Sequence, residues 1–261
     1  MKEFIQKRPI MRFQNGELVD AEDVIVSEFP LTIFVNNEEF ATMVCSPDNL
    51  KELVYGFLAS EGIIRMYNDI LSFELDENKG MAYVQTSSPI SIKQENYSKR
   101  FIGSCCGKSR QFYFQHDVKT AKTVMTETKI SPHECLYLME EMQKQSDVFQ
   151  ATGGVHNAAL GTTSSIMIIR TDIGRHNALD KILGYCILNR ISVRDKVLVF
   201  SGRISSEVLL KAAKIGVGVI LSRSAPSELA IKLAEDLNIT MVGFIRGGSF
   251  NVYTHSKRIN N

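Results

Sequence analysis

The sequence lacks any long apolar run. Its first nine residues hold no apolar core of signal-peptide length, and no later segment has the roughly 18 consecutive apolar residues that a membrane span needs. We therefore expect a cytoplasmic protein with no membrane partner.

A strong charge of either sign is also missing. Thirty Lys and Arg residues balance 29 Asp and Glu residues, so the formal net charge is +1 at pH 7. Apolar residues make up 44% of the chain, which is typical of a soluble globular protein. The bulk charge indicates no nucleic-acid partner, and 261 residues suffice for two modest domains.

Cysteine is scarce, and its positions do not suit a disulfide framework. The five cysteines are an odd, scattered set, as expected for a reducing compartment. Cys45, Cys135 and Cys186 lie within apolar strand or helix patterns, where a free cysteine behaves as a small hydrophobic residue. We predict that these three belong to the core.

Cys105 and Cys106 have a different setting. Glycine residues flank the pair on both sides and Lys108 follows it, so a thiol there has a permissive backbone and a nearby cation that favours the thiolate. This pattern predicts a nucleophilic thiol, and the alternative is a structural pair. We expect no metal ion, because adjacent cysteines rarely share one zinc ion.

The chain reads as two units of different character. The first 95 residues are β-rich, with strands expected at residues 23–29, 31–35 and 39–45 and a helix from about Leu50. The chain turns polar over residues 87–100, which we interpret as a linker. We therefore expect a smaller domain over residues 1–95 and a larger one over residues 96–261.

Helix and strand patterns alternate through the last hundred residues. We expect them at residues 177–189, 196–200, 205–215, 217–222, 226–237 and 240–244. An alternation of this kind predicts a sheet layered with helices, the α/β class.

Glycines and arginines follow the carboxyl ends of the predicted strands, which is where open α/β sheets bind their ligands. Arg175 directly precedes a helix, Arg203 lies in Ser201-Gly202-Arg203, and Arg246 precedes a glycine pair. Helix N-termini and arginines both bind phosphate, so a nucleotide or pterin phosphate is the expected ligand. The alternatives are a helix capped by Asn177 and a simple turn at the glycine pair.

His156 follows the glycine pair Gly153-Gly154, which allows close approach to a ligand; the alternative is a structural histidine. A zinc deaminase would need His-x-Glu followed by Pro-Cys-x-x-Cys. Ala158 occupies the glutamate position and the second motif is missing, so we expect no zinc-dependent deamination.

Taken together, these segments resemble the FdhD family (FdhD/NarQ type), named for formate dehydrogenase accessory sulfurtransferases. The likeness runs across nearly the whole chain. It is carried by GFLASEG at residues 56–62, SCCGK at 104–108, GGVH at 153–156, DIGRHNALDK at 172–181, SGR at 201–203, SAP at 224–226, GFIRGG at 243–248 and VYT at 252–254.

The resemblance implies an α/β protein, α+β overall, with a cytidine-deaminase-like three-layer C-terminal domain without zinc and a smaller β-rich N-terminal domain, usually as a homodimer. It implies a sulfurtransferase that carries persulfide sulfur from a cysteine desulfurase to the molybdenum bis(molybdopterin guanine dinucleotide) cofactor needed by formate dehydrogenase. The alternative is a non-catalytic chaperone for that cofactor.

The resemblance also assigns the cofactor's guanine nucleotide, or GDP as its mimic, to the glycine-rich segment near the C-terminus. The expected binding residues are Phe244, Ile245, Arg246, Gly247, Gly248 and Ser249, together with Arg203, Arg175 and His156.

The cysteine segment departs from the family's pattern, Cys-Gly-x-Cys-Gly-Lys. Here the segment reads Ser-Cys-Cys-Gly-Lys, and spacing to Gly107-Lys108 aligns Cys106 with the second cysteine of the pattern. We therefore predict Cys106 as the persulfide carrier, with Cys105 as its neighbour or substitute.

Overall fold

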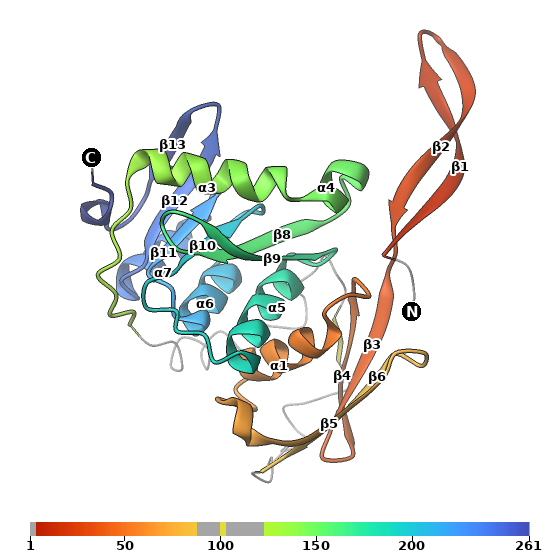
Figure 1. Cartoon of the computed structure of the whole chain (residues 1–261), viewed down its shortest axis with the longest axis horizontal. Coiled ribbons are helices and arrows are strands. Elements are labelled where there is room, and N and C mark those ends of the chain that lie inside the picture. Colours follow the sequence, from red (N-terminus) through yellow and green to blue (C-terminus); the bar gives the residue numbers. More distant parts are fainter. Residues whose placement is uncertain (1–3, 88–99, 103–122, 261) are drawn as a thin grey trace.

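The structure is a computed structural model that describes residues 4–87, 100–102 and 123–260 (Figure 1). Cys105, Cys106 and most of the expected linker lie outside the described residues. The domain boundary at residue 95 also lies outside them and stays a prediction.

The chain begins with a hairpin that projects from the body of the molecule (Figure 1). β1 (Ile5–Gln14) and β2 (Glu17–Val26) pair antiparallel along their whole length. Asn15 and Gly16, with φ of 55° and 90°, form the turn, as an Asn-Gly pair favours. The sequence analysis missed this hairpin: the strand expected over residues 23–29 is in fact the end of β2 followed by the start of β3.

A five-stranded sheet follows, in the order β5-β6-β3-β4-β7. Its strands are β3 (Phe29–Val35), β4 (Glu38–Cys45), β5 (Ile70–Asp76), β6 (Met81–Thr86) and β7 (Arg100–Ile102). Alternate residues of β3 are buried, as period-two strand geometry requires, and the predicted β3–β4 hairpin is confirmed. β7 pairs with β4, so residues just past 95 also join this sheet.

Helix α1 (Leu50–Ser60) packs its apolar face against this sheet and forms one hydrophobic core with it. The short helix η1 (Tyr67–Asp69) connects α1 to β5. The helix predicted to begin near Leu50 is therefore confirmed.

The second sheet has six strands, in the order β13-β12-β11-β10-β8-β9. Its central strands β10, β11 and β12 are parallel, while β8, β9 and β13 pair antiparallel with their neighbours. The strands are β8 (His156–Gly161), β9 (Ile166–Asp172), β10 (Val197–Phe200), β11 (Val219–Ser222), β12 (Thr240–Arg246) and β13 (Ser249–Val252).

Helices cover both faces of this sheet. α5 (Arg175–Leu188), α6 (Ser206–Ile215) and α7 (Glu228–Asp236) share one core with it, and α3 (Pro132–Lys144) packs on the opposite face (Figure 1). The short helices are α4 (Asp147–Thr152) and η2 (Ser256–Arg258). The predicted α/β class is confirmed, while the cytidine-deaminase-like detail stays a prediction.

The two sheets are joined where α1 crosses α5 (Figure 1). A Cβ atom on Gly56 of α1 would lie 1.7 Å from the carbonyl oxygen of Asp180, and one on Gly184 of α5 would lie 1.8 Å from that of Glu52. The helices therefore touch backbone to backbone at two glycines. Among the described residues, no helix is long and apolar enough to cross a membrane.

Candidate functional site

The carboxyl ends of β10, β11 and β12 lie at one edge of the six-stranded sheet. β8 begins at this edge, because Ala158 pairs antiparallel with Phe200 at the end of β10. β9 ends there and α5 follows, because Asp172 pairs with His156. The edge thus brings together His156, Arg175, the loop of Arg203 and the segment from Phe244 onward, as the sequence analysis expected of strand ends.

His156 lies against the loop that follows β10. A Cβ atom on Gly202 would lie 3.3 Å from His156 Nδ1, so glycine at this position leaves room for the imidazole ring. Burial and the neighbouring Arg175 cation lower the pKa of His156, and Asp172 opposes them. The ring is therefore neutral at neutral pH and offers one donor and one acceptor.

Hydrogen bonds fix the loop of Ser201 and Gly202. Ser201 Oγ accepts from the N–H of Asn157 at 2.9 Å, and its own N–H donates to Asn157 O at 3.0 Å. Ser222 Oγ donates to Gly202 O at 2.8 Å. These contacts hold the backbone, so the exposed side chain of Arg203 projects from a fixed loop.

The loop after β11 connects this segment to β12. Ser224 Oγ donates to Ser201 O at 3.2 Å, and Phe244 N–H donates to Ser224 O at 3.3 Å. Phe244 has a φ of 57°, a left-handed conformation that is uncommon for a residue with a side chain. Asn157 and Ser222 were not predicted as site residues, since hydroxyl and amide residues near strand ends are too common to single out.

The glycine-rich segment forms the turn between β12 and β13. Gly247 and Gly248 have φ of 58° and 76°, as a tight hairpin turn requires. The guanidinium of Arg246 lies 5.3 Å from the centre of the Phe244 ring, and Arg246 through Ser249 are exposed. Ile245 is 1% exposed and belongs to the core under α3, so the structure places this predicted binding residue in the core, with no exposed side chain to offer a ligand.

The glycines before His156 have roles within the chain. Gly153, with a φ of 63°, ends α4, and a Cβ atom on Gly154 would lie 2.9 Å from Val26 Cγ1 in the hairpin. The close approach inferred for a ligand is therefore made, at Gly154, by the chain's own Val26.

The run from Asp172 to Lys181, at the end of β9 and the start of α5, is largely occupied by internal contacts. Lys181 Nζ lies 2.8 Å from Asp172 Oδ2 and 2.7 Å from Asp48 Oδ1, and its side chain is 0% exposed. Asp172 also accepts hydrogen bonds from Ser46 N–H and from Asn177 Nδ2. These contacts join α5 to the N-terminal unit.

A second buried ion pair extends this connection. Lys211 of α6 contacts Asp180, whose carboxylate also accepts from Ser60 Oγ of α1 at 2.6 Å. The helix α5 begins after Gly174, and Asn177 lies inside its first turn, donating to Val44 O at 2.9 Å. The alternative in which Asn177 caps the helix is therefore wrong.

Three of the five cysteines are buried and free. Burial raises the pKa of the Cys135 thiol and of the Cys186 thiol to about 12, and it raises the pKa of Cys45 further. These thiols are neutral and shielded, so their predicted place in the core is confirmed.

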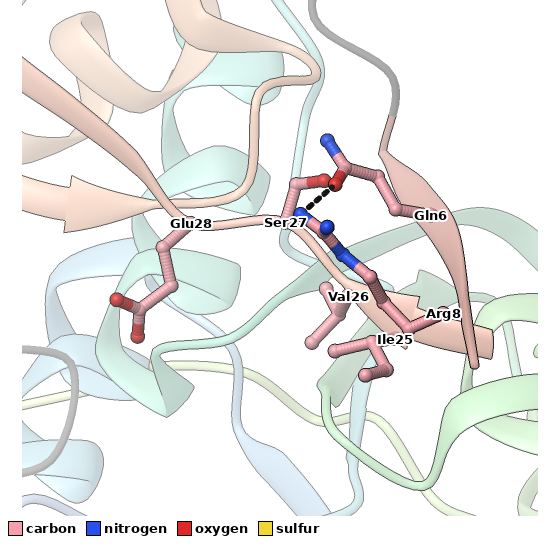
Figure 2. Close-up of a pocket in the computed structure, with 6 residues that line it drawn as sticks. All are labelled: Gln6, Arg8, Ile25, Val26, Ser27 and Glu28. Carbon is pink, nitrogen blue, oxygen red and sulfur yellow. Dashed lines mark hydrogen bonds between the residues drawn. The ribbon is translucent and has the colours of Figure 1, made fainter. Parts of the chain in front are cut away.

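A cavity of about 280 Å³ lies at the foot of the hairpin (Figure 2). It is lined by Gln6, Arg8, Ile25, Val26, Ser27 and Glu28. None of the predicted site residues lines this cavity. Across the described ranges, His, Cys, Asp and Glu side chains form no group of three that could hold a metal ion.

Comparisons with known proteins agree with this arrangement. A crystal structure from Desulfotalea psychrophila, described as a formate dehydrogenase accessory protein, superposes with a TM-score of 0.78 over 99% of this chain and 100% of that one. The two sequences are 23% identical, so this likeness shows the fold alone.

Sequence relatives are much closer. A protein of Bacillus subtilis named sulfur carrier protein FdhD is 60% identical over 252 residues, which cover 97% of this chain and 96% of the relative. A protein of the same name from Staphylococcus aureus is 56% identical over 97% of this chain and 95% of its own length. The sequence model of the FdhD/NarQ family matches residues 26–260. With that match and these identities, the chain belongs to the FdhD/NarQ family.

Proposed function

We propose that this chain is a sulfur carrier that takes persulfide sulfur from a cysteine desulfurase and passes it to a molybdenum bis(molybdopterin guanine dinucleotide) cofactor for formate dehydrogenase. The identity of about 60% with proteins named sulfur carrier protein FdhD, over nearly the full length of both chains, carries this proposal. A sulfur carrier of this kind needs one accessible thiol that can ionise.

The burial of the other cysteines supports assigning that thiol to Cys106 or Cys105. A thiolate is the nucleophile in sulfur exchange, and the three described cysteines are buried and have raised pKa values. In the loading step the thiolate of this chain bonds to the outer sulfur of the donor persulfide. The donor's sulfur–sulfur bond breaks, and its cysteine leaves as a thiolate.

The sheet edge supports a site for the nucleotide part of the acceptor. Arg175, Arg203 and Arg246 supply three cations beside strand ends, and guanidinium groups pair with phosphates through two parallel hydrogen bonds. Neutral His156 adds a donor, and Phe244 offers a ring face at the same edge. This combination suits a pyrophosphate attached to a flat base, such as GDP or the guanine nucleotide of the cofactor.

The loading step is tested by intact-protein mass spectrometry after incubation with a cysteine desulfurase and cysteine. We expect wild type to gain the mass of sulfur, Cys106→Ala to lose this gain, and Cys105→Ala to keep it. The matched control Cys135→Ala, which removes a buried thiol, should load as wild type does. Loading of the Cys105→Ala/Cys106→Ala double variant would contradict the proposal, and no loading of wild type would favour a cofactor chaperone.

The nucleotide site is tested by calorimetric titration with GDP. Removing a charge-assisted contact costs about 1.4 kcal/mol or more, so we expect Arg203→Ala and Arg246→Ala each to weaken binding about tenfold. Arg194 is an exposed arginine just before β10, at the opposite edge of the sheet, so Arg194→Ala should leave the affinity unchanged. Equal affinity of all three variants would place the nucleotide elsewhere.

A further inference from the structure

Asn157 is a buried polar residue at the sheet edge that was not among the predicted site residues. It is 2% exposed and directly follows His156 at the start of β8. Its backbone N–H donates to Ser201 Oγ, and its backbone oxygen accepts from the N–H of Ser201. Ser201 belongs to the loop that carries Arg203, so Asn157 is fixed to a loop of the proposed nucleotide site.

One hydrogen bond orients the side-chain amide of Asn157. Thr171, which is opposite Asn157 on β9, donates from Oγ1 to Asn157 Oδ1 at 2.7 Å. The acceptor end of the amide is thereby turned toward Thr171, and the donor end, Nδ2, is turned away from it. Among the described residues, no group accepts a hydrogen bond from Nδ2.

A donor without an acceptor is unusual at a buried residue. Most buried polar side-chain atoms in proteins have a partner, because an unsatisfied one destabilises the fold. At this same edge, Ser222 Oγ donates to Gly202 O and Asn177 Nδ2 donates to Asp172. Asn157 Nδ2 is not one of the described side-chain atoms that are both fully enclosed and unpartnered, so it is open to the surface. It is therefore placed to donate to a ligand.

The acceptor that suits this nitrogen is an uncharged oxygen. A phosphate buried beside one neutral amide would keep an uncompensated charge, which is costly. The exposed guanidinium groups of Arg203 and Arg246 supply cations for phosphates at the same edge. A carbonyl oxygen carries no charge and needs only a donor. Guanine has a carbonyl group at C6, whereas adenine has an amino group there, which is itself a donor.

We propose that Asn157 selects guanine over adenine by donating a hydrogen bond from Nδ2 to the C6 carbonyl oxygen of the base. This inference rests on the nucleotide site proposed above and adds the residue that identifies the base. Adenine would place its amino donors against the donors of Asn157 and leave both without an acceptor. A site that hydrogen-bonds one group of a ligand rejects an analogue that lacks this group.

Calorimetric titration of the full chain with GDP, IDP and ADP tests this role. IDP keeps the C6 carbonyl group and lacks the 2-amino group of guanine. We expect wild type to bind ADP at least about tenfold more weakly than GDP. Asn157→Ala should weaken the binding of GDP and of IDP about tenfold and leave that of ADP unchanged. Asn157→Asp replaces the donor by an acceptor at nearly the same volume, so it should also remove the preference for GDP.

Asn189 provides a matched control. It is an exposed asparagine at the C-terminal end of α5, whose N-terminal end is at the sheet edge, so Asn189→Ala should bind all three nucleotides as wild type does. Thermal melting followed by circular dichroism identifies any variant that does not fold. The comparison of GDP with ADP on wild type needs no variant.

The outcomes separate this role from the nucleotide site itself. Equal affinity of wild type for GDP and ADP, or equal weakening of all three nucleotides by Asn157→Ala, would overturn the role of Asn157 and leave the site in place. No binding of any nucleotide to wild type would instead overturn the site, and the role of Asn157 with it.

Discussion

Replacing Lys181 by alanine is expected to lower the free energy of unfolding by roughly 3–5 kcal/mol, the range observed when one partner of a buried ion pair is removed. Lys181 is fully buried, and its ammonium contacts Asp172, Asp48 and the carbonyl oxygen of Thr171. Without the cation, the fully buried carboxylate of Asp172 has no opposite charge beside it. Chemical denaturation followed by circular dichroism measures the loss.

The pH dependence of this loss has a definite sign. Burial raises the pKa of Asp172 in the folded protein, and Lys181 opposes that rise. Removing Lys181 therefore raises the pKa of Asp172 further. A carboxyl group whose pKa is higher in the folded than in the unfolded protein binds its proton more tightly when folded. Its ionisation therefore lowers the free energy of unfolding by more as the pH rises above the pKa of the unfolded state. We expect the deficit of Lys181→Ala to shrink as the pH falls toward 4.

Two further variants separate charge from packing. Lys181→Met keeps much of the side-chain volume, and Lys181→Met/Asp172→Asn removes both buried charges, so the double variant should be more stable than Lys181→Met. Lys232 forms an exposed pair with Glu228 at 3.3 Å, and Lys232→Ala should cost less than about 1 kcal/mol. A loss for Lys181→Ala no larger than that of Lys232→Ala would contradict the structural role assigned to Lys181.

The sequence analysis predicted the C-terminal unit well because local signals mark its elements. Ser205 and Ser227 cap α6 and α7 by accepting hydrogen bonds from Val208 N–H and Ala230 N–H. Ser131 and Glu134 form a capping box at the start of α3. Signals of this kind involve residues three positions apart, so they can be read from the chain directly.

The β1–β2 hairpin was missed although its turn is a strong local signal. Both strands are exposed on both faces for most of their length, so they lack the alternation of buried and exposed residues that identifies a strand. An Asn-Gly pair such as Asn15-Gly16 predicts a hairpin strongly only when alternating apolar residues flank it. A strand that is exposed on both faces carries little of the pattern on which sequence reading depends.

The run from Asp172 to Lys181 shows a different limit. Acidic and basic residues before a helix fit an anion site, and Arg175 remains at the sheet edge as that interpretation expects. Asp172 and Lys181, however, contact residues of the N-terminal unit, and Lys181 is 133 positions from Asp48. Contacts over such separations depend on the whole fold, so the residues that hold the two units together resemble ligand-binding residues when only the sequence is read.

The crossing of α1 and α5 gives a second large expected effect. Gly184→Val should lower the free energy of unfolding by roughly 3 kcal/mol, the upper end of the usual cost of overpacking. An added Cβ atom would lie 1.8 Å from the carbonyl oxygen of Glu52 and 2.6 Å from its carbonyl carbon. Both are backbone atoms, so no side-chain rotation relieves the clash, and α1 must move away from α5.

A milder substitution tests this prediction through the sign of its effect on stability. Alanine is favoured over glycine in a helix by about 1 kcal/mol, so Gly184→Ala in an open helix would stabilise the protein. At this crossing we expect destabilisation instead, and Gly56→Ala, whose Cβ would lie 1.7 Å from Asp180 O, should behave in the same way. Moving α1 also strains the ion pair of Glu52 with Arg170, which connects the same two units. A higher melting temperature for either alanine variant would show that the helices do not touch, and the packing of the two units through these glycines would have to be abandoned.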